Sequence, residues 1–142
     1  MATDDVKNIA RRFLQAWNAG QREVVDELAA PDFTADYTHF PEPFESPETF
    51  KQMLAQTHRY FPDLSIEVRD VVADENRAIV HWAYRGTFRE GEMFGVEAAG
   101  QSVEVEGMTK YRIEDGRVQS ERGVVDNFGL MMQLGAAPQP TH

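Results

Sequence analysis

The segment from residue 102 to residue 113, which reads SVEVEGMTKYRI, alternates between two kinds of side chain. A period of two residues is typical of a β-strand with one face buried and the other in water. The odd positions are apolar, aromatic or small: Val103, Val105, Gly107, Thr109, Tyr111 and Ile113. The even positions carry charges, among them Glu104, Glu106, Lys110 and Arg112. The chain therefore needs a sheet with one covered face, and the odd positions are expected to point inward.

Three further segments show the same period of two residues. The inner face of one strand is expected to hold Leu64, Ile66, Val68 and Val72. The next strand has Val80, Trp82 and Tyr84 on its inner face, with His81 and Arg85 on the other. Earlier in the chain, alternate positions of a predicted strand, and therefore one of its faces, are occupied by Phe33, Ala35, Tyr37 and His39. His39 is therefore also expected to point inward.

Apolar residues at helical spacing precede most of these strands. The first helix has Thr3 as its expected cap, acidic residues in its first turn, and an apolar stripe of Val6, Ile9, Ala10, Phe13 and Trp17. Gly20 ends this helix, and a second, short helix carries Val24, Val25 and Leu28 before Pro31. A third helix begins with Ser46 as cap and Pro47 as its first residue, and it is expected to bury Phe50, Met53, Leu54 and Phe61.

The last predicted strand carries an acidic residue, Glu121, where alternation points inward. The turn EDG at residues 114–116 fits a three-residue hairpin loop with Gly116 in the left-handed conformation. Such a loop pairs Ile113 with Arg117 and places Thr109 opposite Glu121. A two-residue Asp-Gly turn would shift the pairing and send Glu121 outward. We favour the three-residue loop, because it matches apolar positions of the two strands with each other.

The same pairing sets Gly107 opposite Gly123. Two facing glycines leave space where side chains would otherwise fill the interior. With aromatic neighbours and an inward acid, this gap predicts a small-molecule pocket. The alternative is a bend or bulge of the sheet at both glycines.

Composition narrows the possible functions. A length of 142 residues predicts a single domain over residues 1–142, with residues 136–142 as a flexible tail. The chain has no cysteine, which excludes disulfides, thiolate catalysis and cysteine-ligated metal. A formal charge of −10 argues against a nucleic-acid partner, which needs clustered Lys and Arg. No apolar run approaches the roughly 20 residues of a membrane helix, so we expect no membrane association. The start, MATDDVKN, lacks the features of a signal peptide, so a cytoplasmic location is expected.

The sequence motifs give little support for metal binding, nucleotide use or serine-type hydrolysis. His58, His81 and His142 show no metal-ligand spacing, and no metal or other cofactor is expected. The chain has neither a glycine-rich phosphate loop nor a nucleophile elbow, which argues against nucleotide use and serine-type hydrolysis. Asp126 stands where the last helix needs a side-chain cap, and we interpret it as structural.

Several phrases, in this order along the chain, resemble the SnoaL-like polyketide cyclase family. They are HFPEPFESPETFKQML from His39, FPDL at 61–64, YRGTF at 84–88, YRIEDGRV at 111–118 and VVDNFGLMMQLG at 124–135. The resemblance implies an α+β, cone-shaped nuclear transport factor 2-like fold. In that fold, N-terminal helices pack against a curved antiparallel sheet that encloses a pocket.

The resemblance also implies acid–base chemistry without a cofactor. In the characterised cyclases a proton leaves a carbon next to a carbonyl, and the enolate closes a ring by intramolecular aldol condensation. A buried aspartate and nearby histidines move the protons there. The family's His-Trp-Asp strand positions fall on Glu121, Arg122 and Gly123, so Gly123 replaces the aspartate. The inward Gln and His positions of the partner strand fall on Gly107 and Thr109.

Three residues are candidates for catalysis. Glu121 is a candidate general acid or base, because burial would raise its pKa toward neutrality; the alternative is a structural salt bridge. His39 matches a histidine position of the family and titrates near neutral pH; the alternative is a core histidine hydrogen-bonded to a neighbouring strand. Tyr37 could donate to a substrate oxygen, although aromatic residues at such spacings are usually core. The expected pocket walls are Trp17, Phe61, Trp82, Tyr84, Gly107, Thr109 and Gly123, and Met108 is expected to pack in the interior.

Three functions fit these features. The first is an enzyme that cyclises, isomerises or hydrates a hydrophobic carbonyl or polyketide-like metabolite, with Glu121 as acid or base and His39 or Tyr37 on the oxygen side. The second is a binding module for a similar hydrophobic ligand, and the third is a dimerisation scaffold. The polar strand face with His81, Arg85, Lys110 and Arg112 is expected to pack against a second copy in a symmetric homodimer.

Overall fold

The fold is that of a computed structural model, which describes residues 2–136. Its helical segments are α1 (Thr3–Leu14), the short 3-10 helix η1 (Gln15–Trp17), α2 (Val24–Leu28), α3 (Pro47–Tyr60) and α4 (Asn127–Leu134). Its strands are β1 (Ala29–Tyr37), β2 (Ser65–Ala73), β3 (Arg77–Phe88), β4 (Glu92–Met93), β5 (Val96–Glu97), β6 (Gln101–Glu114) and β7 (Arg117–Val125). Apart from Ala136, the expected tail and His142 lie outside the described residues.

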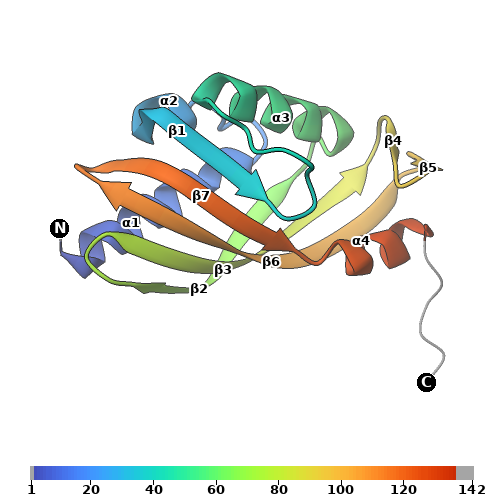
Figure 1. Ribbon diagram of the computed structural model, residues 1–142. Coiled ribbons are helices and arrows are strands. Elements are labelled where there is room, and N and C mark those ends of the chain that lie inside the picture. The colour runs from blue at the N-terminus through green and yellow to red at the C-terminus, as the bar shows by residue number, and fades with distance from the viewer. Residues whose placement is uncertain (1, 137–142) are drawn as a thin grey trace.

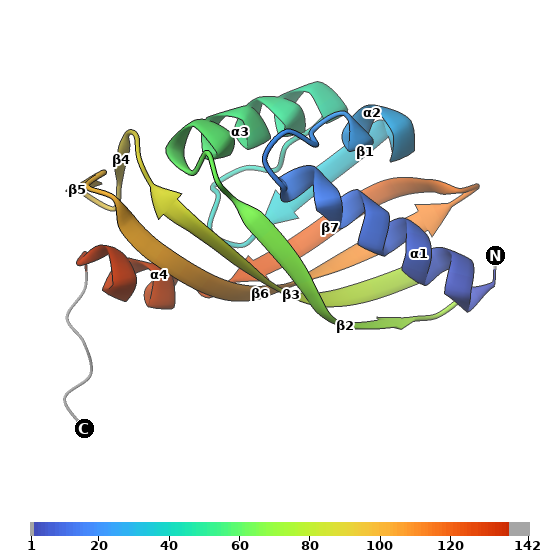
Figure 2. The same ribbon diagram turned by 180° about the vertical axis from the view of Figure 1, so that it is seen from behind.

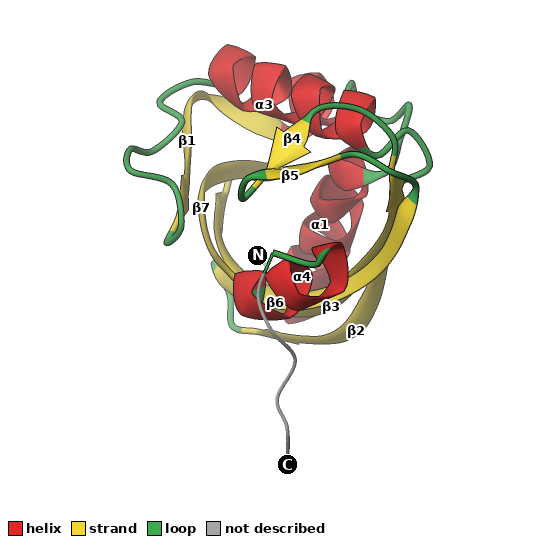
Figure 3. Ribbon diagram, turned by 90° about the vertical axis from the view of Figure 1, so that its right-hand side faces the viewer, coloured by secondary structure: helices red, strands yellow, loops and turns green. Residues whose placement is uncertain are grey.

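Five strands form one curved sheet in the order β1-β7-β6-β3-β2, and β4 pairs with β5 alone. The sheet wraps around an interior that α1 and α3 cover, and its two edges do not meet (Figures 1 and 3). This is the predicted α+β architecture. One detail differs, because β1 runs parallel to β7 and makes the sheet mixed rather than antiparallel. From behind, Figure 2 shows α1 lying across the sheet with α3 above it.

The helices follow the sequence signals closely. Ser46 caps α3 in a capping box with Thr49, and Pro47 is the first helical residue, as predicted. Helix α1 begins one residue earlier than expected, because Ala2 rather than Thr3 holds the cap position. Its regular turns end at Leu14, and Trp17 lies in the 3-10 turn that follows. Among residues 2–136, no helix combines the length and apolar character needed to cross a membrane.

Strand β2 changes face in its middle. A shift in its pairing with β3 between Val68 and Asp70 reverses the alternation of the residues that follow. Val71 is therefore buried, whereas Val72 is 56% exposed, and the prediction that Val72 points inward is wrong. Met108, predicted to pack in the interior, also lies on the outer face of the sheet, with 52% exposure.

The hairpin between β6 and β7 has a two-residue turn and a bulge. Asp115 and Gly116 both have positive φ angles, and Glu114 pairs with Arg117, so the three-residue loop was wrong. An irregularity opposite Arg112 and Ile113 then inserts one extra residue, Gln119, into β7, so that Glu121 again points inward. Glu121 does point inward, but it pairs with Tyr111 rather than Thr109.

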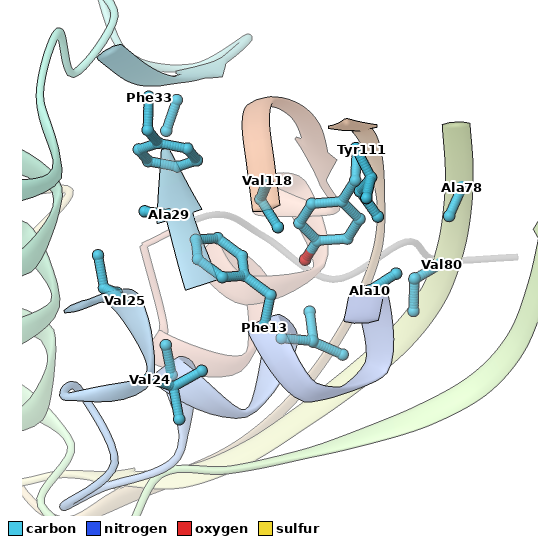
Figure 4. Packing of buried hydrophobic residues seen from close by; sticks show 14 of the residues in the cluster. Ala10, Phe13, Val24, Val25, Ala29, Phe33, Ala78, Val80, Tyr111 and Val118 are labelled. Atoms are coloured by element: carbon cyan, nitrogen blue, oxygen red, sulfur yellow. The ribbon is translucent and has the colours of Figure 1, made fainter. Parts of the chain in front are cut away.

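The interior under α1 is filled by aromatic and branched side chains. Figure 4 shows Tyr111 packed near Phe13, Val80 and Val118, and the rings of Phe13 and Tyr111 meet edge to face with centroids 6.0 Å apart. A second buried cluster lies toward α4 and includes Phe61, Leu64, Phe88, Val103, Val105, Leu130 and Leu134. The space between these clusters contains the candidate site.

Candidate functional site

A largely apolar cavity of about 200 Å³ opens between the curved sheet, helix α3 and the start of α4. Its walls are Trp17, Tyr37, His39, Phe40, Met53, Gln56, Thr57, Tyr60, Phe61, Leu64, Ile66, Trp82, Tyr84, Met93, Val125, Asn127 and Leu130. The concave face of the sheet and the buried side of α3 meet there. Such a cavity suits a hydrophobic ligand that is held by a few polar groups.

The predicted pocket residues divide into two sets. Trp17 and Phe61, predicted from helical spacing, and Trp82 and Tyr84, predicted from strand parity, line the cavity. The other predicted wall residues, Gly107, Thr109 and Gly123, do not line it.

The two glycines make room for aromatic rings and leave no gap. They are not opposite each other, since Gly107 pairs with Val125 and Gly123 pairs with Thr109. A Cβ atom at Gly107 would lie 2.4 Å from the Trp82 ring, and one at Gly123 would lie 2.1 Å from the Tyr37 ring. The predicted hole in the sheet is therefore wrong, because each glycine is in close contact with a ring that forms the cavity wall.

Glu121 lies behind this wall. Its side chain is 3% exposed and does not line the cavity, and one of its oxygens, Oε2, accepts a hydrogen bond from the hydroxyl of Tyr37. The other oxygen, Oε1, has no hydrogen-bond partner among the described residues, and the same holds for the hydroxyl of Tyr111. Glu121 is not in an ion pair with any residue of the described range, so the predicted alternative of a salt bridge finds no partner there.

Burial controls the protonation of the hydrogen-bonded pair of Glu121 and Tyr37. Loss of hydration raises the pKa of Glu121 to about 8, although the hydrogen bond from Tyr37 acts in the opposite direction. Burial and the neighbouring carboxyl also raise the pKa of Tyr37 well above its ordinary value. Near neutral pH, both groups are therefore mostly protonated. A neutral carboxyl can donate to Tyr37 as well as accept from it, which frees the hydroxyl hydrogen of Tyr37 for another acceptor.

Thr109 has a structural part in the same cluster. Its hydroxyl accepts a hydrogen bond of 2.9 Å from Nε1 of Trp82, and both side chains are buried. This bond satisfies the indole N–H and fixes the plane of a ring that forms the cavity wall.

His39 reaches the cavity from a turn and not from a strand. The amide of Phe40 donates to the carbonyl of Tyr37 over 3.0 Å, so the chain turns immediately after β1. His39 is exposed, which contradicts the predicted inward strand position, yet it lines the cavity mouth. Its ring centroid lies 6.1 Å from that of Tyr37. Partial burial lowers the pKa of His39, so its imidazole is neutral near pH 7 and can accept a proton.

Helix α3 supplies cavity residues that were not predicted as pocket walls, although Met53 was predicted to be buried. Met53, Gln56, Thr57 and Tyr60 recur at the spacing of one helical face, and this periodicity could have identified them. Asn127 was also missed. It follows Asp126, whose side chain caps α4 as predicted by accepting a hydrogen bond of 2.9 Å from the amide of Gly129.

The other histidines lie outside the site. His58 is a buried residue of α3, and its Nδ1 contacts Arg22 while its Nε2 contacts the carbonyl of Trp17. His81 lies on the outer face of the sheet beside Glu106. Between residues 2 and 136, no three His, Asp or Glu side chains are grouped so that they could hold a metal ion.

Helices packed on a curved open sheet, with an apolar cavity between them, define the cone-shaped nuclear transport factor 2-like class of fold. A family model of SnoaL-like polyketide cyclases matches residues 7–134, and the chain belongs to this family. Its members are named for enzymes that act on small molecules. The comparison with curated proteins gives no match.

Solved structures of similar chains agree with this assignment. A candidate SnoaL-like polyketide cyclase from Jannaschia sp. CCS1 is 28% identical, with a TM-score of 0.79 over 94% of this chain and 93% of that one. AclR of Streptomyces galilaeus, described as a candidate hydroxylase, is 24% identical, with a TM-score of 0.84 over 99% and 91%. TsrD of Streptomyces laurentii is 24% identical, with a TM-score of 0.83 over 96% and 99%. The last two establish the fold alone.

Proposed function

We propose that the protein is a cofactor-independent acid–base enzyme that cyclises, isomerises or hydrates a hydrophobic carbonyl compound of polyketide-like character. The observation that carries this proposal is the contact between Tyr37, in the wall of an apolar cavity, and the buried carboxyl of Glu121. His39 adds a neutral imidazole at the cavity mouth next to Tyr37. Proton transfer next to a carbonyl requires a hydrogen-bond donor for the carbonyl oxygen and an acceptor for the proton, and Tyr37 and His39 supply these two groups.

The roles follow from these positions. The substrate carbonyl accepts a hydrogen bond from Tyr37, whose oxygen accepts one in turn from neutral Glu121. His39 removes a proton from the carbon next to the carbonyl, so a C–H bond breaks and an N–H bond forms. Tyr37 stabilises the negative charge on the resulting enolate oxygen. Return of the proton at another carbon isomerises the substrate, whereas attack of the enolate on a second carbonyl closes a ring.

Glu121 acts through Tyr37 and does not touch the substrate, which changes the role proposed for it from sequence. The ring of Tyr37 contacts Gly123, the position where the family resemblance places an aspartate. We infer that Tyr37, supported by Glu121, replaces that aspartate as the polar group of this wall.

Deuterium exchange of 1-tetralone in D₂O, followed by proton NMR, tests this proposal without knowledge of the natural substrate. The wild-type protein should accelerate exchange at the carbon next to the carbonyl, and Tyr37→Phe and His39→Ala should each lower the rate by about a hundredfold or more. His81→Ala is the matched control, because His81 lies on the outer face. Equal rates in the wild type and both cavity variants would contradict the proposal.

A binding module is the second candidate, and one observation favours it. Glu121 does not line the cavity, and Gly123 provides no carboxylate there. A binding module would bind 1-tetralone and quench tryptophan fluorescence, because both tryptophans of the chain line the cavity. It would leave the exchange rate of the ketone at that of buffer, which separates it from an enzyme.

We also propose that two copies associate through the outer face of the sheet. This face exposes four apolar side chains, Val72, Ile79, Met108 and Val124. Its charges form local pairs, among them Arg85 with Glu104, Arg122 with Asp36 and His81 with Glu106. These ion pairs on the outer face limit the repulsion between two chains that each carry a formal charge of −10.

Sedimentation equilibrium tests the association. The wild-type protein should have twice the mass of the 16.1 kDa chain, and Met108→Glu should have the mass of one chain. A monomeric wild type at all protein concentrations would contradict this second proposal.

A further inference from the structure

The polar side chains of the cavity differ in whether the protein already satisfies them. The hydroxyl of Tyr37 contacts Glu121, and the indole N–H of Trp82 donates to Thr109. The hydroxyl of Tyr84 and the amide of Asn127 form no hydrogen bond with any residue of the range 2–136. Both of these unpaired side chains line the cavity.

Tyr84 is enclosed by apolar neighbours. Its ring stacks on Trp82 with centroids 5.9 Å apart, and it packs against both buried clusters. Burial raises the pKa of Tyr84 above its ordinary value, so the hydroxyl keeps its hydrogen. Tyr84 is only partly buried and lines the cavity, so an apolar ligand that excludes water there would leave its hydroxyl without a partner. A ligand oxygen at this position would supply the missing partner.

Tyr84 lies across the sheet from Tyr37, and Asn127 lies at the start of α4, four residues beyond Gly123, the strand partner of Tyr37. Tyr37 lies at the end of the edge strand β1, whereas Tyr84 lies on β3, with β7 and β6 between them. Neighbouring strands are about 4.8 Å apart, so these positions are separated by roughly 14 Å along the sheet. The sheet curves between them, and Figure 3 shows β1 and β3 on different sides of the enclosed space.

We propose that Tyr84 and Asn127 form a second polar contact point, which binds a hydroxyl group at the end of the ligand remote from the reacting carbonyl. This inference rests on the proposed function, since it assumes that a hydrophobic carbonyl compound occupies the cavity. A ligand hydroxyl can accept from the O–H of Tyr84 and donate to Oδ1 of Asn127. The ligand class is therefore an apolar ring system with a carbonyl at one end and a phenolic hydroxyl at the other.

Two ketones that differ by one hydroxyl test the inference. Binding of 1-tetralone and of 6-hydroxy-1-tetralone is measured by quenching of Trp17 and Trp82, which both line the cavity. The wild-type protein should bind the hydroxylated compound at least about fivefold more tightly, because the ligand hydroxyl gains two hydrogen bonds, one with Tyr84 and one with Asn127. In Tyr84→Phe and in Asn127→Ala this gain, taken as the ratio of the two affinities within each variant, should disappear.

Asn76→Ala, in the turn between β2 and β3, is the control and should keep the gain. If both cavity variants keep the gain, or if the wild type shows none while it binds 1-tetralone, the inference is overturned and the proposed function stands. If the wild type binds neither ketone, both are overturned.

Discussion

Gly123→Ala tests the closest contact in the cavity wall. The added Cβ would lie 2.1 Å from Cε1 of Tyr37 and 2.5 Å from Cδ1, whereas ordinary contacts begin at 3.4 Å. The ring must therefore withdraw by about 1 Å or more, and its neighbours, Trp17 and Phe40, restrict that movement. Withdrawal would also weaken the only hydrogen bond that Glu121 receives from the described residues.

The expected cost combines two effects. Overpacking of a buried site costs about 1–3 kcal/mol, and a buried polar group that loses its partner costs about 1–3 kcal/mol more. We therefore expect Gly123→Ala to lower the free energy of unfolding by about 4 kcal/mol. Without the contact between position 123 and the Tyr37 ring, Gly123→Ala would raise the free energy of unfolding, because alanine in a strand is favoured over glycine by roughly 0.5–1 kcal/mol.

Urea unfolding followed by tryptophan fluorescence measures this cost, in the wild type and in a Tyr37→Leu background. Removal of the ring should reduce the cost of Gly123→Ala to less than about 1 kcal/mol. An equal cost in both backgrounds, or a stabilising Gly123→Ala in the wild type, would refute the contact between Gly123 and Tyr37.

Three further predictions concern charge and backbone strain. Burial and the adjacent Arg22 lower the pKa of His58, so the unfolded chain binds a proton first as the pH falls; from pH 7 to pH 5 the wild type should lose stability relative to His58→Gln, and a stability difference that stays constant over this range would contradict this. Glu121 has the opposite sign: with a folded pKa of about 8 against an ordinary value of 4.5, its contribution to stability is full at low pH and is lost as the pH rises through 8. Stability curves from pH 5 to pH 9 should fall more steeply for the wild type than for Glu121→Gln, with Glu75→Gln as an exposed control. Phe94 has a φ of 53° and is 45% exposed, so Phe94→Gly should raise the free energy of unfolding by roughly 1 kcal/mol, and an equal gain in Phe94→Ala would argue against strain as the cause.

Short-range signals made part of the fold predictable. The box of Ser46, Pro47 and Thr49 marks the start of α3, and Asp126 marks the start of α4, because each cap is a contact within four residues. The inward position of Glu121 also follows from alternation. Its pairing did not, because the bulge in β7 adds one residue without a distinctive sequence; the bulge in β2 reversed the predicted face of Val72 for the same reason.

The candidate site was harder to predict because it depends on contacts between distant segments. From the sequence, Gly107 and Gly123 predict empty space inside the fold. In the structure, each glycine faces an aromatic ring from another strand. His39 fits the strand pattern, but the turn after Tyr37 moves it to the cavity mouth. Neither contact is visible from spacing along the chain.

Titration of the Glu121 carboxyl carbon by NMR, with assignment confirmed by Glu121→Gln, tests most directly whether a buried neutral carboxyl supports Tyr37. We predict a midpoint near pH 8, which leaves the group mostly protonated at neutral pH. A midpoint near the ordinary value of 4.5 would place an ionised carboxylate behind the cavity wall and contradict the proposed roles of Glu121 and Tyr37.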